Sequence, residues 1–179
     1  MNHCLIRRGS LILKLLNKLE FVWGINMEIN FREINKSNYN NCISLKLGKH
    51  QINYVASNAF SLVQSFYEDK LYPLGIYNGD EMIGFLLYDY DEELKGWSFS
   101  RFMIDIEHQN KGFGTKALEK FLDFFHNKFP NKNLYTSVEI DNEVAVKLYE
   151  KYGFNKINSF EYKVEDITYK EFRMLKESW

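Results

Sequence analysis

A short polar segment carries the residues whose types and spacing suggest chemistry: Gln109-Asn110-Lys111-Gly112-Phe113-Gly114-Thr115. It follows an apolar, strand-like stretch and opens a long amphipathic stretch, so its two glycines lie at the start of a predicted helix. The amides and the dipole of a helix N-terminus attract anions, and glycine lets phosphate oxygens approach the backbone. Lys111 and Lys116 add positive charge nearby. The segment therefore predicts a phosphate-binding loop.

Other interpretations of this segment compete with that one. A nucleotide-binding P-loop requires GxxxxGK[ST], and the first glycine of that pattern is missing here. A dinucleotide-binding turn requires GxGxxG, and its third glycine is missing. An ordinary glycine-containing turn before a helix remains an alternative while the segment is taken alone.

A second motif follows the next strand-like stretch. It runs from Asp141 to Phe154 and places Ala145, Leu148 and Tyr149 at helical spacing. By spacing alone, Tyr149 would be a core aromatic packed beside Ala145. The glycine-containing segment that precedes this motif favours a functional role for Tyr149 instead.

Together the two motifs resemble those of the GNAT superfamily of N-acetyltransferases. The matching residues are Gln109, Gly112 and Gly114 for the family pattern Q/R-x-x-G-x-G/A, Asn142 and Tyr149 for its asparagine-to-aromatic helix, and Tyr152-Gly153-Phe154 for the end of that helix. The resemblance covers essentially every predicted element after Met27, in the same order. It identifies the first motif as a loop for the pyrophosphate of coenzyme A.

Within the superfamily, the chain looks most like the bacterial diamine and polyamine acetyltransferases. The residues that carry this likeness are 101–105 (RFMID), 51–58 (QINYVASN) and Ser61-Leu62. Ser100 stands where relatives often carry a carboxylate. The implied acceptor is a primary amine of a small diamine or polyamine such as spermidine or spermine, and the predicted acceptor-binding residues are Tyr54, Ser100 and Glu139.

The resemblance also implies how acetyl-CoA is held as co-substrate. In the family, the central strand bulges and splays from its neighbour, which opens a wedge for pantetheine. The implied cofactor-binding residues are Phe102, Met103, Ile104, Gln109, Asn110, Lys111, Gly112, Phe113, Gly114, Thr115 and Asn142. The Ile104 amide would stabilise the oxyanion. Tyr149 would protonate the leaving thiolate, because a tyrosine pKa near 10 is close to that of a thiol.

The sequence leaves the general base and the exact acceptor open. Glu139, Asp105 and the acidic segment 89–93 are candidates for a base that acts through water. The acidic segment is equally a solvated hairpin tip or a rim that attracts cations. A protein N-terminus, a lysine side chain and an amine-bearing drug are alternative acceptors. A catalytically silent acyl-CoA-binding module is the alternative outside the enzymes.

The elements that must position these residues alternate between strand and helix patterns. Strands are predicted over 27–34, 71–77, 82–90, 97–106, 134–140 and, as a final pair, 154–172; helices over 38–47, 54–67, 112–129 and 142–152. The fold class is α/β. The resemblance implies a single-domain GNAT fold: a mixed, mostly antiparallel twisted sheet of about seven strands, with helices on both faces and a splayed central strand pair.

Composition narrows the function classes further. The net charge of -1 and the pI near 6.4 disfavour a nucleic-acid partner, because there is no global basic field. Two cysteines, Cys4 and Cys42, make no disulfide framework and suggest reduced thiols in the cytoplasm. Without HExxH, CxxC or histidines at ligand spacing, no metal is predicted. A homodimer is expected only from the resemblance.

The first 26 residues, 1–26, are predicted to be an accessory leader or the product of a mis-assigned start, and 27–179 the N-acetyltransferase domain. Arg7 and Arg8 precede an apolar run that Lys14 and Lys18 interrupt, which argues against a secretory leader. No apolar run approaches the roughly 18 residues of a membrane span. The leucines from 11 to 19 form a helical stripe that suits a membrane surface or a partner.

Overall fold

The structure is a computed structural model that describes residues 27–179. Its elements follow the predicted order: β1 (Ile29–Glu33), α2 (Tyr39–Ser44), α3 (Asn58–Tyr67), β2 (Leu71–Asn78), β3 (Glu81–Asp91), β4 (Gly96–Ile104), η1 (Ile106–His108), α4 (Phe113–Lys128), β5 (Leu134–Glu139), α5 (Glu143–Lys151), β6 (Asn155–Val164) and β7 (Ile167–Lys176). The predicted leader 1–26, with its leucine stripe and Cys4, lies outside the described residues.

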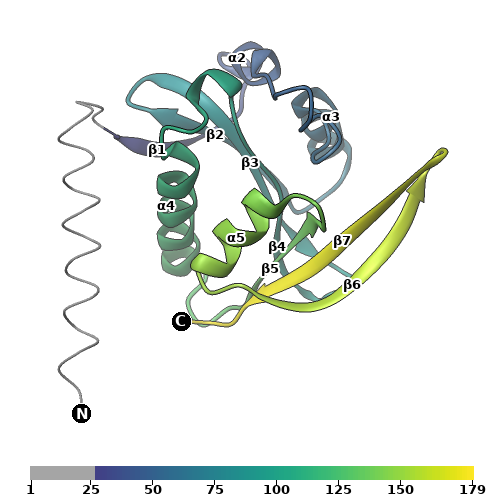
Figure 1. Cartoon of the computed structure of the whole chain (residues 1–179). Coiled ribbons are helices and arrows are strands. Elements are labelled where there is room, and N and C mark those ends of the chain that lie inside the picture. The colour runs from purple at the N-terminus through teal and green to yellow at the C-terminus, as the bar shows by residue number, and fades with distance from the viewer. Residues whose placement is uncertain (1–26) are drawn as a thin grey trace.

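The strands form one seven-stranded sheet in the order β1-β2-β3-β4-β5-β7-β6. Every neighbouring pair is antiparallel except β4 and β5, which confirms the predicted mixed, mostly antiparallel sheet. The parallel pair arises because helix α4 connects the two strands and returns the chain in the same direction. Figure 1 shows α4 and α5 together beside the sheet, with the β6–β7 hairpin extending away from the other strands.

Helices cover both faces of the sheet, as predicted. On the front face, α4 and α5 bury the larger core, in which Phe99 of β4 meets Phe121 of α4 edge-on. On the back face, α2 and α3 cover a smaller cluster, whose buried members are Cys42, Tyr77, Met82, Phe85, Leu87 and Met103. Burial raises the pKa of the Cys42 thiol to about 12, so this cysteine stays protonated and unreactive.

The sheet opens between its two central strands. β4 and β5 pair only through residues 97–99 and 134–136, although β4 continues to Ile104 and β5 to Glu139. A register shift in the β3–β4 pairing leaves Ser100 without an opposite residue, and such a β-bulge bends a strand. The predicted splayed strand pair is therefore confirmed, with the bulge at the point where the gap begins.

Two predicted helices are shorter than their sequence patterns indicate. The first, predicted over 38–47, ends at Ser44. The second, predicted from Tyr54, begins later because the Ser57 hydroxyl oxygen accepts the amide of Phe60 at 3.2 Å and caps the helix there. The residues between the two helices are thus available for contacts with the rest of the fold.

The acidic segment 89–93 is only partly a loop. β3 runs to Asp91, so residues 92–95 alone form the turn to β4. At this turn, Asp91 Oδ1 accepts two backbone amides, and Glu92 pairs with Lys70. The predicted cation-attracting rim is therefore a hairpin turn in which two carboxylates are engaged within the turn and its neighbours.

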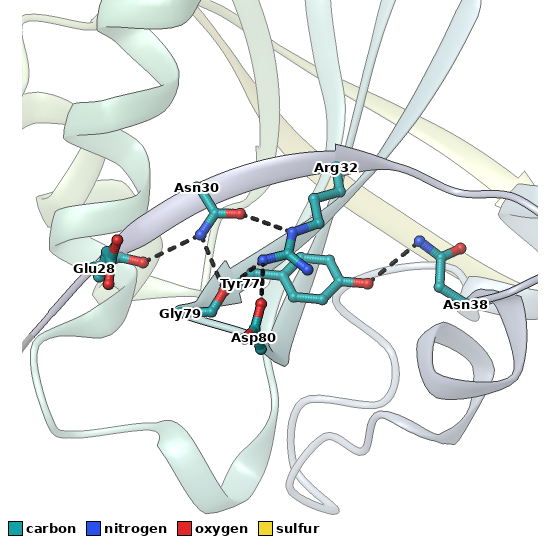
Figure 2. A network of polar contacts seen from close by, with 7 residues as sticks. All are labelled: Glu28, Asn30, Arg32, Asn38, Tyr77, Gly79 and Asp80. Atoms are coloured by element: carbon teal, nitrogen blue, oxygen red, sulfur yellow. Dashed lines mark hydrogen bonds and ion pairs between the residues drawn. The ribbon is translucent and has the colours of Figure 1, made fainter.

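A polar network fastens β1 to the turn between β2 and β3 (Figure 2). Arg32 donates to the Gly79 carbonyl at 2.7 Å and to Asp80 Oδ1 at 2.9 Å, and its guanidinium carbon lies 4.3 Å from the centre of the Tyr77 ring. The Asn38 side-chain amide donates to the Tyr77 hydroxyl at 3.3 Å, which extends the network to the start of α2. Because its ion pair is exposed, the network orders the turn more than it stabilises the fold.

Candidate functional site

The gap between β4 and β5 presents backbone groups of β4 that have no strand partner. The Asp105 amide donates to the Ile83 carbonyl of β3 at 2.8 Å, so strand alternation directs the backbone groups of Met103 toward β3 too. The N–H and C=O groups of Phe102 and Ile104 consequently point into the gap. An extended ligand can pair with Phe102 and with the amide of Ile104, whose carbonyl accepts the Gln109 side-chain amide at 2.9 Å. Met103 instead contributes its buried side chain to the back-face cluster.

The segment Gln109–Thr115 turns tightly into α4. Asn110 and Gly112 have φ values of 59° and 87°, and Lys111 between them has a negative φ. Such alternation is typical of the nests in which successive backbone amides converge on an anion. The first hydrogen bond of α4 runs from the Lys116 amide to the Gly112 carbonyl, so the amides before it have no acceptor within the helix. The helix dipole adds to their attraction for an anion.

The two glycines of this loop differ in what the surrounding structure demands of them. A Cβ atom at Gly114 would meet only Ile104 Cγ1, at an ordinary distance of 3.7 Å. Packing among residues 27–179 therefore does not demand glycine there, and the open backbone suits an approaching phosphate. Gly112 instead needs its positive φ, and a Cβ there would press on Met27 Cε at 3.3 Å. The loop therefore leaves open backbone at Gly114 for an anionic group to approach.

Side chains of the predicted loop residues mostly face the protein. Phe113 is buried in the front core, so only its backbone can meet a ligand. The Lys111 ammonium donates to the Glu107 carbonyl at 2.6 Å. Gln109 donates its side-chain amide hydrogens to other parts of the protein, and Thr115 is half-buried in the first turn of α4. Backbone amides are therefore the principal ligands that this loop offers.

Tyr149 stands at the closed end of the gap. Its ring is 5% exposed and meets Phe99 edge-on at 5.4 Å and Phe154 at 5.9 Å. Phe99 is the last residue of β4 that pairs with β5, so the tyrosine lies where the two strands part. Burial raises the pKa of Tyr149 above its ordinary value, and no hydrogen bond to residues 27–179 offsets that effect. The hydroxyl therefore keeps its proton at neutral pH.

Asn142 is the N-cap of α5. Its Oδ1 accepts the amide of Ala145 at 3.2 Å, which satisfies one of the amides at the helix start. The carboxamide oxygen is therefore occupied by the cap. The side-chain NH₂ group, for which residues 27–179 provide no acceptor, is the group that Asn142 can offer to a pantetheine arm.

Charged side chains gather on the back face beside the gap. Leu87 and Met103 belong to the back-face cluster, so residues two positions away on β3 and β4 face the same side. Val138 and Phe172 belong to the front core, so their neighbours on β5 and β7 face the back. These back-face residues are Asp89 (β3), Arg101 (β4), Glu139 (β5) and Glu171 (β7), and we call them the back-face charges.

Ser100 is joined to one of these charges. Its hydroxyl donates to Asp89 Oδ2 at 2.6 Å, and burial raises the pKa of Asp89 although this hydrogen bond opposes the shift. The structure thus brings a carboxylate to the serine from the neighbouring strand. Arg101 Nε is buried without a partner among residues 27–179, and burial lowers the pKa of this guanidinium, opposed mainly by Asp89.

Glu139 lies directly opposite Glu171 in the β5–β7 ladder. The Tyr162 hydroxyl donates to Glu171 Oε1 at 2.7 Å, and the Lys170 amide donates to Glu139 Oε2 at 3.4 Å. Burial raises the pKa of Glu139, the Lys170 amide opposes this shift, and the charge of Glu171 adds to it. Within residues 27–179, neither carboxylate forms an ion pair. Like charges that lie opposite each other destabilise a sheet. Arg101 on the same face interacts with Glu171 and offsets part of this repulsion, and a further cation would offset more of it.

The other predicted acceptor-side residues are placed differently. Tyr54 is half-buried between α2 and α3, and no hydrogen bond joins it to Ser100 or Glu139 within the described part of the chain. Asp105, a predicted candidate for the base, accepts the Glu107 amide at 2.9 Å with one oxygen and the Lys46 amide at 2.7 Å with the other. Its carboxylate therefore has a structural use, which argues against a role as base.

Sequence reasoning missed Glu171 and the link between Asp89 and Ser100. The alternation of Glu171 with the apolar Phe172 is a signal that could have placed it on the sheet face of Glu139. The serine–aspartate contact depends on the bulge and has no comparable sequence signal. Within residues 27–179 no group of three or more His, Cys, Asp or Glu side chains could hold a metal ion. None of the helices described there is long and apolar enough to cross a membrane.

Comparison with protein families gives a match over most of the described region. A family model described as the acetyltransferase (GNAT) family matches residues 38–154. This range includes the loop Gln109–Thr115 and the α5 residues Asn142 and Tyr149. It begins after β1 and ends at the residue that precedes β6.

Individual relatives point the same way. The spermine/spermidine N(1)-acetyltransferase of Bacillus subtilis is 28% identical over 152 residues, covering 81% of this chain and 99% of the relative. The solved spermidine N-acetyltransferase from Vibrio cholerae, in complex with CoA and spermine, has a TM-score of 0.68 at 18% identity over 86% of this chain and 97% of that one. The ribosomal-protein-S18-alanine N-acetyltransferase from Escherichia coli has a TM-score of 0.63 at 15% identity over 84% and 94%. At these identities, the solved structures show the fold alone.

Proposed function

The chain belongs to the acetyltransferase (GNAT) family, and we propose that it transfers the acetyl group of acetyl-CoA to a primary amine of a small polyamine such as spermidine or spermine. The observation that carries the acceptor proposal is the opposed pair Glu139 and Glu171 beside the gap, with Asp89 on the same face. The name of the Bacillus subtilis relative supports the same acceptor class.

Backbone groups would bind the cofactor. Acetyl-CoA supplies the acetyl thioester when bound. The amides of residues 110–115 would hold its pyrophosphate, and the backbone of Phe102 would pair with its pantetheine arm. The Ile104 amide, directed into the gap, would donate to the oxyanion as it develops. One such donor is typically worth roughly 3 kcal/mol of transition-state stabilisation.

The two substrates would reach the gap from opposite faces. Tyr149 lies on the front face with α5, where its hydroxyl would protonate the departing thiolate. Glu139 and Glu171 lie on the back face, where their charges would attract a polyamine. A polyamine suits this site because its unreacting ammonium groups can stay near the carboxylates while the reacting amine enters the gap.

The reacting amine must be neutral when it attacks, and Glu139 is the base that we propose. Burial, the main cause of its raised pKa, moves its carboxylate toward the range in which a base works best at neutral pH. A raised pKa means that Glu139 becomes protonated at a higher pH than an ordinary glutamate as the solution is acidified. On acidification, kcat should therefore begin to fall with an apparent pKa above 4.5, the ordinary pKa of glutamate.

The proposal is tested by thiol release from acetyl-CoA with a panel of amines. We expect kcat/KM to be highest for spermidine or spermine, lower for a diamine, and lowest for a peptide N-terminus, a lysine peptide and an aminoglycoside. A peptide preferred over the polyamines would replace the proposed acceptor and leave the acetyl transfer intact. Absence of thiol release with every amine would favour a silent acyl-CoA-binding module.

A charge-neutral variant tests the acceptor site within the same prediction. Glu171→Gln should raise the KM for spermidine by about tenfold or more, because a hydrogen bond to a charged group contributes about 1.5–3 kcal/mol. The matched control is Glu161→Gln, which removes a carboxylate that alternation places on the front face of the same hairpin. Equal KM values for the two variants would contradict the role of Glu171. The affinity for CoA should be unchanged in both.

We also propose that residues 27–179 are the N-acetyltransferase domain and that acetyl transfer does not need residues 1–26. Met27 packs against the front core, and every motif that binds acetyl-CoA lies after it. A chain that begins at Met27 should therefore bind CoA with unchanged affinity and keep its kcat. Loss of either property in this shortened chain would show that residues 1–26 contribute to the domain.

A further inference from the structure

A short segment between α2 and α3, residues 46–51, is tied to the end of β4 and the loop that follows it. The Asp105 carboxylate accepts the Lys46 amide at 2.7 Å, and the Ile106 amide donates to the Lys46 carbonyl at 2.8 Å. These contacts hold the segment against the chain that leads into the pyrophosphate loop. The neighbouring side chains of Leu45 and Leu47 pack against the back-face cluster.

Gln51, at the end of this segment, contacts the pyrophosphate loop itself. Gln109 Nε2 donates to Gln51 Oε1 and to the Ile104 carbonyl, each at 2.9 Å. Gln51 Oε1 also accepts the Gly48 amide at 3.1 Å, so its position is fixed from its own segment. Both hydrogens of the Gln109 amide are therefore used within the protein, and its side chain acts as a brace.

We propose that Gln51 is a positioning residue for the cofactor loop, acting through Gln109. The brace joins the first residue of the loop to the Ile104 carbonyl, next to the backbone that faces the gap. The amides that would hold pyrophosphate and the backbone that would pair with pantetheine are thereby kept in one arrangement. Gln51 supplies the acceptor that fixes the orientation of the Gln109 side chain.

The arrangement also links the cofactor loop to the back face. The amide of Tyr54 donates to the Gln51 carbonyl at 3.0 Å, so a predicted acceptor-binding residue is joined to the same brace. The proposal for Gln51 rests on the proposed function, because it requires that this loop holds the pyrophosphate of CoA. The effect of Gln51 on CoA alone does not depend on which amine is the acceptor.

A double-mutant cycle with CoA as the probe tests the proposal in the full chain. Gln51→Leu keeps the side-chain size and removes the acceptor; it should raise the CoA dissociation constant about three- to tenfold, as expected for one lost hydrogen bond. Gln109→Leu should have a similar or larger effect. The double variant should bind CoA no more weakly than the single variant that binds it less tightly, because both substitutions break the same brace. At saturating acetyl-CoA, kcat of the Gln51→Leu variant should stay near the wild-type value.

The control is Gln64→Leu, which removes the amide that pairs with Glu68 on the exposed side of α3. It should leave the CoA dissociation constant unchanged. If Gln51→Leu binds CoA as the control does, Gln51 does not position the loop. If the fold-changes in the CoA dissociation constant of Gln51→Leu and Gln109→Leu multiply in the double variant, the two residues act separately. This result would also overturn the proposal. A variant that loses thermal stability and kcat but not CoA affinity would assign Gln51 a purely structural role.

Discussion

Gly114→Val is expected to raise the dissociation constant of CoA about 100-fold while the protein remains folded. Loss of one or two hydrogen bonds to a charged pyrophosphate, at about 1.5–3 kcal/mol each, accounts for an effect of this size. The structure predicts that the fold survives, because the first added carbon would meet only Ile104 Cγ1 at 3.7 Å. Isothermal titration with CoA measures the affinity, and thermal unfolding measures the stability.

Gly114→Ala sharpens the test, because stability and affinity should change in opposite directions. Gly114 is the second residue of α4, and alanine is favoured over glycine in a helix by up to about 1 kcal/mol. The variant should therefore unfold at the same or a higher temperature and bind CoA more weakly. Normal CoA affinity in a folded Gly114→Ala or Gly114→Val protein would contradict the proposal that this loop binds the pyrophosphate.

Gly112 gives the contrasting case. Its φ of 87° disfavours any residue with a side chain, so Gly112→Ala should lower both stability and CoA affinity. If Gly112→Ala and Gly114→Ala both lowered stability and CoA affinity together, both glycines would serve only the conformation of the turn. The comparison therefore distinguishes an effect on the conformation of the loop, expected at Gly112, from an effect on ligand access, expected at Gly114.

Local sequence was sufficient to predict where the loop that we propose for the cofactor turns into a helix. The pyrophosphate loop is contiguous, and its amides follow from where α4 begins, so Gly112 and Gly114 identify it without knowledge of the rest of the fold. The order of the strands and the splay between β4 and β5 could be predicted only through the resemblance to a family. The pattern of apolar residues does not indicate that β4 and β5 pair over only a few residues.

The proposed acceptor side depends on contacts between distant segments, which the sequence does not reveal. Glu139 was a candidate base from the sequence, but Glu171, which lies opposite it, belongs to another strand of the β5–β7 ladder, whose register the sequence does not reveal. Asp89 reaches Ser100 only because of a bulge in the facing strand. Side-chain contacts of this kind are set by register, and a shift of one residue would move each group to the other face.

Tyr149→Phe is expected to lower kcat by about 10² to 10⁴, the range typical of a lost proton donor, with CoA affinity close to wild type. The substitution keeps the ring that packs against Phe99 and Phe154 and removes only the hydroxyl. That hydroxyl has no hydrogen-bond partner among residues 27–179, so its loss should change thermal stability very little. Loss of rate without loss of stability is the signature of a catalytic hydroxyl.

The raised pKa of Tyr149 bears on how the proton would move. Burial keeps the phenol protonated, which is the state that a donor needs, but it also makes the phenol a weaker acid than free tyrosine. A thiolate that departs into the same buried region loses solvation as well, so its own affinity for a proton rises. The two shifts run in the same direction, and transfer from the phenol remains feasible. The wild-type kcat should show no alkaline fall from Tyr149 up to the ordinary tyrosine pKa near 10.

The matched control is Tyr152→Phe, which removes a half-buried tyrosine hydroxyl one turn further along, at the end of α5. Its kcat should stay near the wild-type value, so the difference between the two variants isolates the hydroxyl at the gap. The measurement requires saturating acetyl-CoA and the best amine of the panel, because with a poor acceptor the attack of the amine would limit the rate and hide the proton transfer. If Tyr149→Phe then turns over within about threefold of wild type, a change of roughly 0.65 kcal/mol in barrier height, the phenol is not the proton donor. The acetyl-CoA site would stand, and the departing thiolate would have to take its proton from water or from the acceptor amine.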